Sequence, residues 1–100
     1  MAKRSSSGQS AHDQEVLRVV RQLRRDGWDV SADLPGFTKP APVGADGRVP
    51  DVEAHKSGHR KLVEVETPES LGTDRDQQAT FRRSVAQKHN DSFEIVVTDV

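Results

Sequence analysis

Residues 48–67 contain two runs in which apolar and polar residues alternate, separated by the short turn sequence KSGH. Successive side chains of a β-strand point to opposite faces, so this period of two predicts two strands, and the short turn makes them antiparallel neighbours. In the second run, KLVEVETPES, Leu62, Glu64 and Glu66 share one face while Val63 and Val65 share the other. We therefore expect a hairpin with an apolar core face and an acidic face.

The acidic face of this hairpin has two interpretations. In the first strand Asp51, Glu53 and His55 lie opposite Val52 and Ala54, so both strands contribute acids. Exposure to solvent accounts for such a face, since charged residues are mostly exposed. A bound cation also accounts for it, because carboxylates at this spacing repel each other unless a positive charge neutralises them. The pattern alone does not distinguish the two.

The composition limits the size of the fold and the kinds of partner. A chain of 100 residues is long enough for one domain with one modest core. Its 15 basic and 16 acidic residues nearly cancel, so a polyanion site has to be local rather than global. The chain has no cysteine for disulfides or thiolate chemistry, and no apolar run long enough for a transmembrane helix or a signal peptide. We expect a cytoplasmic location and no membrane partner.

The N-terminal part predicts a flexible tail followed by a helix. Residues 1–10, MAKRSSSGQS, are basic and serine-rich without apolar periodicity, and we expect them to be disordered. A capping pattern at Ser10 and Asp13 begins the helix, and Gly27 ends it. Its apolar stripe consists of Val16, Val19, Val20 and Leu23. Its outer face carries three arginines that fit a solvated ridge better than a phosphate site: Arg18, Arg21 and Arg25.

The remaining segments complete the predicted order of elements. Residues 28–34 alternate as a strand, and residues 35–47 contain three prolines and three glycines, which predicts a long loop. After Pro68, a cap at Thr73 with Asp76 three residues later predicts a second helix. Residues 92–100 predict a buried strand parallel to an earlier one, because a helix carries the chain across. The expected fold is α/β: one domain over residues 11–100, with the order α-β-β-β-α-β and a central mixed four-stranded sheet flanked by helices.

This order, with PD at the start of the second strand and EVE at the end of the third, resembles the PD-(D/E)xK, or restriction-endonuclease-like, nuclease superfamily over roughly residues 12–98. The resemblance implies that Asp51, Glu64 and the backbone carbonyl of Val65 bind Mg²⁺ or Mn²⁺, which activates water against a phosphodiester. Oxygen ligands from two adjacent strands suit both metals. The candidate catalytic residues are Asp51, Glu64, Glu66 and Gln77.

One position departs from the superfamily's pattern. The lysine expected two residues after Glu64 is Glu66, as in some restriction enzymes that resemble this arrangement. A carboxylate at this place can hold a metal or act as a base, and we take Glu66 as a metal ligand first. Lys56, Lys61 and Lys88 are weaker candidates for binding the substrate in place of the missing lysine.

Further candidates lie on the two helices. Gln77 and Phe81, in QQATF, resemble an exonuclease-like branch of the superfamily, with Phe81 in the core and Gln77 reaching toward the acids. The alternative is an exposed glutamine beside a core phenylalanine. Glu15 is a candidate for an extra acid that the superfamily often places on the first helix. His12 and His55 have no partner at metal-ligand spacing, and we expect ordinary polar roles for both.

The expected function is a metal-dependent nuclease, or a nuclease-like domain that processes nucleic acid, with DNA as the first candidate polymer and Mg²⁺ or Mn²⁺ as cofactor. The missing lysine and the near-zero net charge favour an alternative, a catalytically inactive module of the same fold that binds nucleic acid or a protein. A small structural partner of a larger complex is a third interpretation. A homodimer is compatible with each of them.

Overall fold

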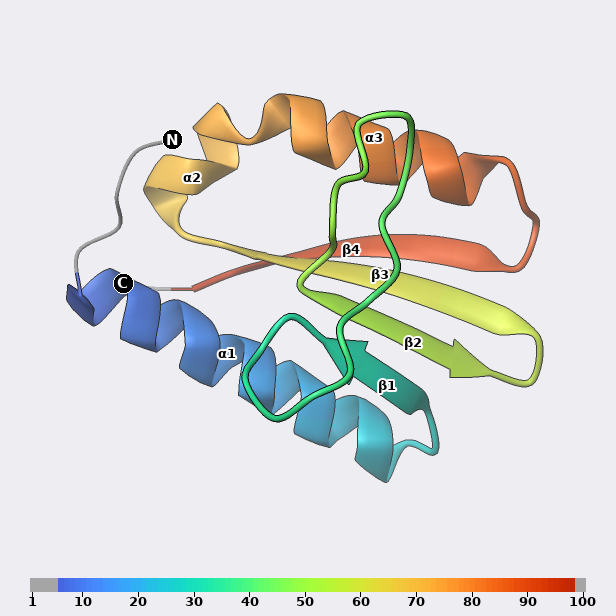
Figure 1. The fold of residues 1–100 in the computed structure, drawn as a ribbon, viewed down its shortest axis with the longest axis horizontal. Coiled ribbons are helices and arrows are strands. Elements are labelled where there is room, and N and C mark those ends of the chain that lie inside the picture. The colour runs from blue at the N-terminus through green and yellow to red at the C-terminus, as the bar shows by residue number, and fades with distance from the viewer. Residues whose placement is uncertain (1–5, 99–100) are drawn as a thin grey trace.

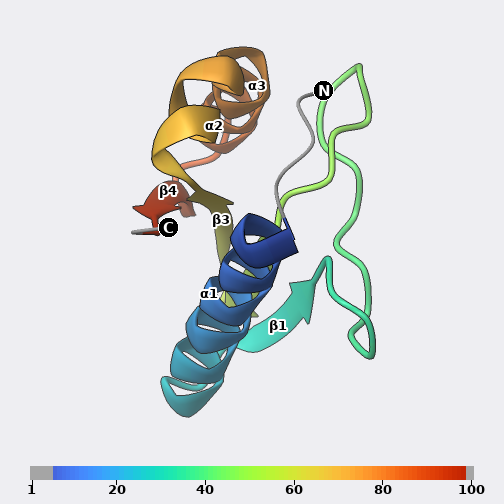
Figure 2. The same cartoon turned by 90° about the vertical axis from the view of Figure 1, so that its left-hand side faces the viewer.

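A four-stranded mixed sheet separates helix α1 from helices α2 and α3 in the computed structural model, which describes residues 6–98 (Figures 1 and 2). The elements are α1 (Ser6–Arg25), β1 (Asp29–Ala32), β2 (Val52–Lys56), β3 (His59–Glu66), α2 (Pro68–Thr73), α3 (Arg75–Ala86) and β4 (Asp91–Val97). The sheet has the order β1-β2-β3-β4, antiparallel except for the parallel pair β3 and β4. The predicted α/β fold, its order of elements and its mixed sheet are confirmed, with two helices in the place of the second.

Helix α1 begins earlier than the sequence predicted. It starts at Ser6, so residues 6–10 of the expected tail are helical and Ser10 is not the cap. Residues 1–5 lie outside the described residues. Serine and glycine cost a helix at most about 1 kcal/mol each relative to alanine, and propagation adds one hydrogen bond per residue. A weakly polar N-terminal segment can therefore extend a helix whose later turns are held by packing.

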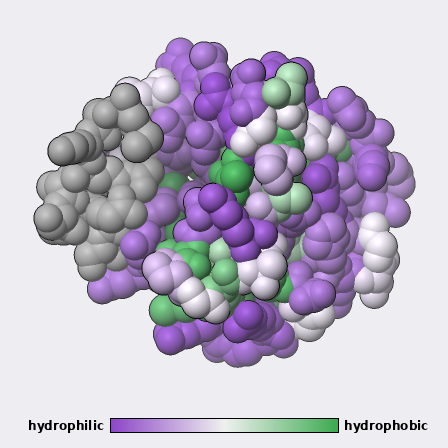
Figure 3. All heavy atoms as spheres, in the orientation of Figure 1, coloured by the Kyte–Doolittle hydropathy of each residue, from purple (hydrophilic) through white to green (hydrophobic). Residues whose placement is uncertain are grey.

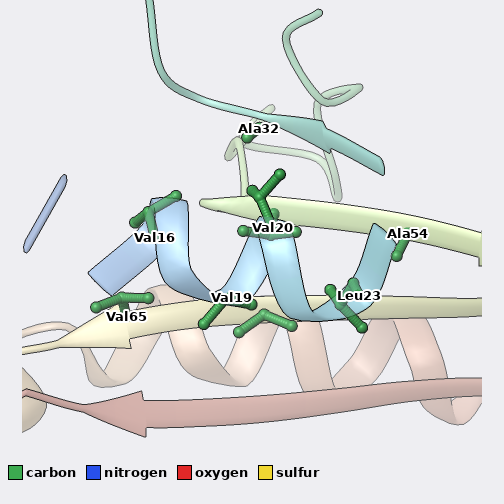
Figure 4. Packing of buried hydrophobic residues seen from close by; sticks show 9 residues of the cluster. Val16, Val19, Val20, Leu23, Ala32, Ala54 and Val65 are labelled. Carbon is green, nitrogen blue, oxygen red and sulfur yellow. The ribbon is translucent and has the colours of Figure 1, made fainter. Parts of the chain in front are cut away.

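The apolar stripe of α1 forms the larger of two core clusters, on one face of the sheet. Val16, Val20 and Leu23 of α1 face Ala54 and Val65 of the sheet in Figure 4. The cluster consists of Val16, Val19, Val20, Leu23, Ala32, Val52, Ala54, Val63 and Val65. The stripe and the apolar face of the hairpin therefore pack as their periodicities predicted.

The other face of the sheet, predicted to be acidic, is also covered, so a simple solvent-exposed face does not account for its acids. Leu62 packs there with Phe81 of α3 and with Val43, which comes from the long loop between β1 and β2. The loop turns at Gly44, where a Cβ atom would lie 2.6 Å from Thr80 Cγ2, and its φ of +76° also favours glycine. Because this loop and α3 both cover β3, its residues 62–66 are buried on both faces.

Two turns set the geometry on either side of β3. The hairpin between β2 and β3 turns at Ser57 and Gly58, both with positive φ, as expected for a two-residue turn that matches the strand twist. After β3, Thr67 caps α2 through a reciprocal capping box with Ser70. The cap predicted at Thr73 is wrong, because Thr73 ends α2 and the chain breaks before α3.

The surface is mainly hydrophilic on the face seen in Figure 3. Leu71 and Val97 are the large apolar side chains that are exposed among the described residues. None of the helices between residues 6 and 98 is both long and apolar enough to cross a membrane. A homodimer stays a prediction.

Candidate functional site

Asp51 lies where strand β2 leaves its ladder with β3. The register pairs Val52 with Val63, and the residue before Asp51 is Pro50, which has no N–H to continue the ladder. The side chain of Asp51 replaces a backbone partner for the next part of β3, since its Oδ2 accepts a hydrogen bond from the backbone N–H of Val65 at 2.8 Å. The sequence PD therefore both ends the strand pairing and turns a carboxylate toward the C-terminal end of β3.

Glu64 faces Asp51 across this end of the hairpin. Its Oε1 accepts a hydrogen bond from the Asp51 N–H at 2.8 Å, and its Oε2 accepts one from Gln77 Nε2 at 2.7 Å. The side chain is 2% exposed. Burial, followed by the negative charge of Asp51, raises the pKa of Glu64 to about 9. The carboxyl is therefore largely protonated at neutral pH in the absence of a cation.

Glu66 lies two residues after Glu64 in β3, so its side chain is on the same face of the strand. Its Oε2 accepts a hydrogen bond from Ser70 Oγ at 2.5 Å, while its buried Oε1 has no hydrogen-bond partner in the described structure. Burial, together with the negative charge of Asp74, raises the pKa of Glu66 to about 7, against the lowering effect of the hydrogen bond from Ser70.

His12 is a site residue that the sequence interpretation missed. It is 6% exposed, and its Nε2 lies 3.3 Å from Asp51 Oδ2 while its Nδ1 lies 3.2 Å from Asp13 Oδ1. The signal was present in the sequence, because His12 precedes Val16 by four residues and so extends the apolar stripe by one turn. A polar residue on the buried face of a helix needs a partner, and here that partner is a candidate metal ligand.

Asp74 is the second residue that was missed. It caps α3 by position, but its side chain makes no capping hydrogen bond to the first turn of that helix. Its negative charge instead contributes to the raised pKa of Glu66. The sequence signal was hidden because the second helix was expected to begin at Thr73 as one continuous element.

Gln77 and Phe81 lie as the resemblance implied. Phe81 is fully buried against Leu62, and Gln77, one turn earlier on the same face of α3, reaches Glu64. The exposed-glutamine alternative is therefore wrong. The N–H and C=O of one residue in a strand point to the same side, so the carbonyl of Val65 faces the side of Asp51.

The other candidates lie away from these acids. Lys56 ends β2, about 17 Å along the strand from Asp51, and Lys61 lies near the start of β3, about 10 Å along the strand from Glu64 and on the opposite face. Lys56 bonds to the Asp26 carbonyl, and Lys61 lies 5.5 Å from the Trp28 ring. Lys88 is exposed in the turn before β4, at the same far end of the sheet. The expectation that these lysines replace the missing motif lysine is therefore not supported by their positions.

Glu15 and His55 also have other partners. Glu15 is bonded to Arg18 on the same helix, and His55 lies 2.9 Å from Glu53. Asp51, Glu64 and Glu66 form no ion pair with a lysine or arginine among the described residues. The acidic site, defined by Asp51, Glu64, Glu66 and Asp74, therefore has His12 beside Asp51 but no lysine or arginine paired with Asp51, Glu64 or Glu66 among residues 6–98.

The donor atoms of the acidic site are chemically suited to Mg²⁺ or Mn²⁺, since they are carboxylate and carbonyl oxygens. Asp51, Glu64 and the Val65 carbonyl would hold an ion between the two strand ends. In the described part of the chain, however, no three acidic or histidine side chains are already arranged around one ion position. Because Glu64 is bonded to the Asp51 N–H and to Gln77, its carboxylate would have to exchange one of these partners for the ion.

Comparison with known proteins shows the fold and goes no further. A scan against protein-family models finds no match, and a search of curated proteins finds none. Among solved structures, the crystal structure of an FdxN element excision controlling factor protein from Anabaena variabilis is similar, with a TM-score of 0.53 and 19% identity. The match covers 83% of this chain and 68% of that chain. The match supports the α/β arrangement itself, a single domain with the order α-β-β-β-α-β and a four-stranded mixed sheet.

Proposed function

We propose that this chain is a nucleic-acid-processing domain that uses Mg²⁺ or Mn²⁺ to hydrolyse phosphodiester bonds in DNA. The observation that supports this most directly is that Asp51 and Glu64 lie side by side at one end of the hairpin. The Asp51 backbone nitrogen lies 2.8 Å from Glu64 Oε1, and Gln77 is hydrogen-bonded to the same glutamate. These are the residue types and strand positions of the superfamily's metal-binding motif. The similar solved structure belongs to a protein named for control of the excision of the FdxN element, which makes DNA the first polymer to test.

In this proposal the residues of the chain orient the carboxylates before the ion arrives. The Val65 N–H and His12 fix one oxygen of Asp51, which leaves Oδ1 free to bind metal. Gln77 and the Asp51 N–H hold Glu64. A bound divalent ion would activate water and stabilise negative charge on the phosphate. Hydrogen bonds to ligating carboxylates are known to increase both the precision and the affinity of such sites.

The alternative function is a catalytically inactive module of the same fold. The specific observation in its favour is that both oxygens of Glu64 are already satisfied within the protein, in a buried carboxyl whose pKa is about 9. Such a carboxyl can remain protonated as a structural group when the Gln77 amide turns its oxygen to accept the Glu64 O–H. The nuclease and the inactive module differ in whether a divalent ion displaces one of the two hydrogen bonds of Glu64.

The test is cleavage of labelled single-stranded, duplex and branched DNA, and of RNA, by the purified chain with Mg²⁺, Mn²⁺ or a chelator. We expect divalent-dependent cleavage that Asp51→Asn and Glu64→Gln each reduce by at least about 100-fold, since each removes a charged group at the reaction centre. Glu69→Gln, an exposed glutamate in the first turn of α2, is the matched control and should retain activity. Absence of divalent-dependent cleavage, or cleavage that survives both substitutions, would overturn the nuclease proposal.

A further inference from the structure

Strand β4 pairs with β3 along one edge, and its other edge has no partner among residues 6–98. It is the last strand in the order β1-β2-β3-β4, and no described element lies beyond it in Figure 2. Just before β4, the Asn90 carbonyl accepts a hydrogen bond from the Arg60 N–H of β3 at 3.2 Å. Just after β4, the Thr98 N–H donates to the Glu66 carbonyl at 2.8 Å. Because backbone groups alternate in direction along a strand, the outward N–H and C=O groups belong to the odd-numbered residues Phe93, Ile95 and Val97.

The free edge of β4 lacks the features that usually protect an edge strand. Natural edge strands are kept short, are bulged, or carry lysine or proline. Strand β4 has seven residues, DSFEIVV, with neither lysine nor proline. The other edge strand, β1, has four residues, and the Ala32 N–H at its end donates to the Thr38 carbonyl of the following loop. The edge of β4 is therefore the one that can accept a further strand.

A groove of about 610 Å³ is lined by residues of α2, α3 and β4, a volume within the range of ligand pockets. Its apolar lining comes from Pro68, Leu71 and Ile95. Val97 follows Ile95 by two residues and so lies on the same face of β4. Leu71 and Val97 are the large apolar side chains that are exposed in the described chain, at 37% and 46%. Exposed apolar side chains that gather in this way mark an interaction site.

Two arginines of α3 give this groove a positive charge. Arg75 and Arg82 both line it, and neither forms an ion pair with another described residue. The Arg82 guanidinium lies 5.7 Å from the centre of the Phe93 ring, which holds it over β4. The guanidinium of an arginine binds a carboxylate through two parallel hydrogen bonds. The groove therefore favours a partner with acidic side chains.

We propose that the groove and the free edge of β4 bind an extended acidic peptide of a partner protein, which adds to the sheet as a fifth strand. The peptide backbone pairs with the outward N–H and C=O groups of β4. On one face of the peptide, apolar side chains contact Leu71 and Ile95. On the same face, carboxylates pair with Arg75 and Arg82. This interaction uses none of the residues of the acidic site, so it is independent of the proposed function.

A second copy of this chain fits the groove less well. Two β4 strands paired across a two-fold axis would place both α3 helices on the same face of the joined sheet. Arg75 and Arg82 of the two copies would then meet without an acid between them, and like charges that face each other weaken an interface. Glu94 cannot supply that acid, because its side chain lies on the other face of β4, 3.9 Å from Lys61.

A nucleic acid also fits less well. Its phosphates can bind Arg75 and Arg82, but it has no peptide groups to pair along the edge of a strand. The apolar side chains of Leu71 and Val97 offer nothing to a phosphate backbone. An extended peptide is the partner that satisfies the free backbone groups, the apolar lining and the arginines together.

The test is titration of the full chain, in chelator, with the capped peptide TETVTETV, followed through backbone amide shifts and hydrogen exchange. The glutamates and valines of this peptide share one face when it is extended. We expect a dissociation constant on the order of 1 mM or lower, with slower exchange at the amides of Phe93, Ile95 and Val97. The counterpart TQTVTQTV should bind about 10-fold more weakly, because two arginine–carboxylate pairs are lost.

Substitutions in the chain separate the backbone pairing from the charge. Val97→Pro removes an outward N–H and keeps the pairing of β4 with β3, so it should weaken TETVTETV by about 5-fold or more. Arg75→Gln combined with Arg82→Gln should weaken it by about 10-fold. Arg21→Gln, an exposed arginine on α1, is the matched control and should bind as the unsubstituted chain does. Urea unfolding checks that each variant is folded.

The remaining outcomes would overturn the proposal. They are no binding at millimolar peptide, equal binding of TETVTETV and TQTVTQTV, and binding that leaves the exchange of the β4 amides unchanged. Slow exchange at these amides without peptide, increasing with protein concentration, would assign the edge to a second copy. Tighter binding of octathymidylate than of TETVTETV, with the same dependence on Arg75 and Arg82, would assign the groove to nucleic acid. None of these results affects the metal site at Asp51 and Glu64, because the titration contains no free divalent ion.

Discussion

Without metal, the stability of this protein should fall as the pH rises through the neutral range, because Glu64 is buried without a counter-charge. Its pKa is raised to about 9 from the ordinary value of 4.5, first by burial and then by Asp51. A raised carboxyl pKa contributes stability that is complete below the unfolded-state pKa and is lost as the pH rises toward the folded-state pKa. Each pH unit in that window costs up to about 1.4 kcal/mol, so the free energy of unfolding should fall by up to about 4 kcal/mol between pH 5 and pH 8. Glu66, with a pKa of about 7, acts in the same direction.

Glu64→Gln isolates this effect because it removes the ionisable group and keeps the shape. Its amide oxygen can accept from the Asp51 N–H, and Gln77 can turn its own amide to accept from the new NH₂ group. Urea unfolding in chelator at pH 5, 6, 7 and 8 should show a much shallower pH dependence for the variant, with greater stability than the unsubstituted chain at pH 8. Glu69→Gln should retain the full dependence. A stability of the unsubstituted chain that is constant or rises over this range would refute the reasoning.

Three further substitutions test the packing of the loop over the sheet and the role of His12. Gly44→Ala should destabilise the protein by about 2 kcal/mol or more in urea unfolding, because its Cβ would meet Thr80 and its φ is positive, whereas Gly36→Ala, with positive φ but open space, should cost only about 1 kcal/mol. Equal losses would contradict the packing explanation. His12→Phe keeps a ring but removes the bond to Asp51, and should lower the free energy of unfolding by about 1–2 kcal/mol and Mn²⁺ affinity by about 10- to 100-fold. Unchanged Mn²⁺ affinity in calorimetry would show that His12 has no part in holding the ligand.

The fold could be predicted where periodicity and turn chemistry agree. The stripe from Val16 to Leu23 and the hairpin turning at Ser57 and Gly58 depend on local spacing, and the parallel β4 follows from the intervening helix. The cover over the second face of β3 could not be predicted, because Val43 reaches it from a loop distant in sequence. Likewise, Thr67 caps α2 through a capping box with Ser70. The sequence instead favoured Thr73 as the cap, because an acid follows it three residues later.

The candidate site was predictable only in part. Asp51, Glu64 and Gln77 came from a resemblance, and the structure bonds the Glu64 carboxyl to the Asp51 backbone N–H and to the Gln77 side chain. The remote positions of Lys56 and Lys61 could have been deduced, since both flank the hairpin turn while the acids lie at its open end. The burial of His12 could have been deduced from the apolar stripe, but its partner Asp51 and the place of Asp74 needed tertiary information, because they depend on which strand ends the helices meet.

The central claim, that Asp51, Glu64 and the Val65 carbonyl bind a divalent cation, is tested most directly by titrating the isotope-labelled chain with Mg²⁺ and following its backbone amides. The account predicts saturable shifts at Asp51, Glu64 and Val65 that disappear in Asp51→Asn and persist in Glu69→Gln. Amide positions that stay unchanged at these three residues up to millimolar Mg²⁺, in a chain that remains folded, would contradict it.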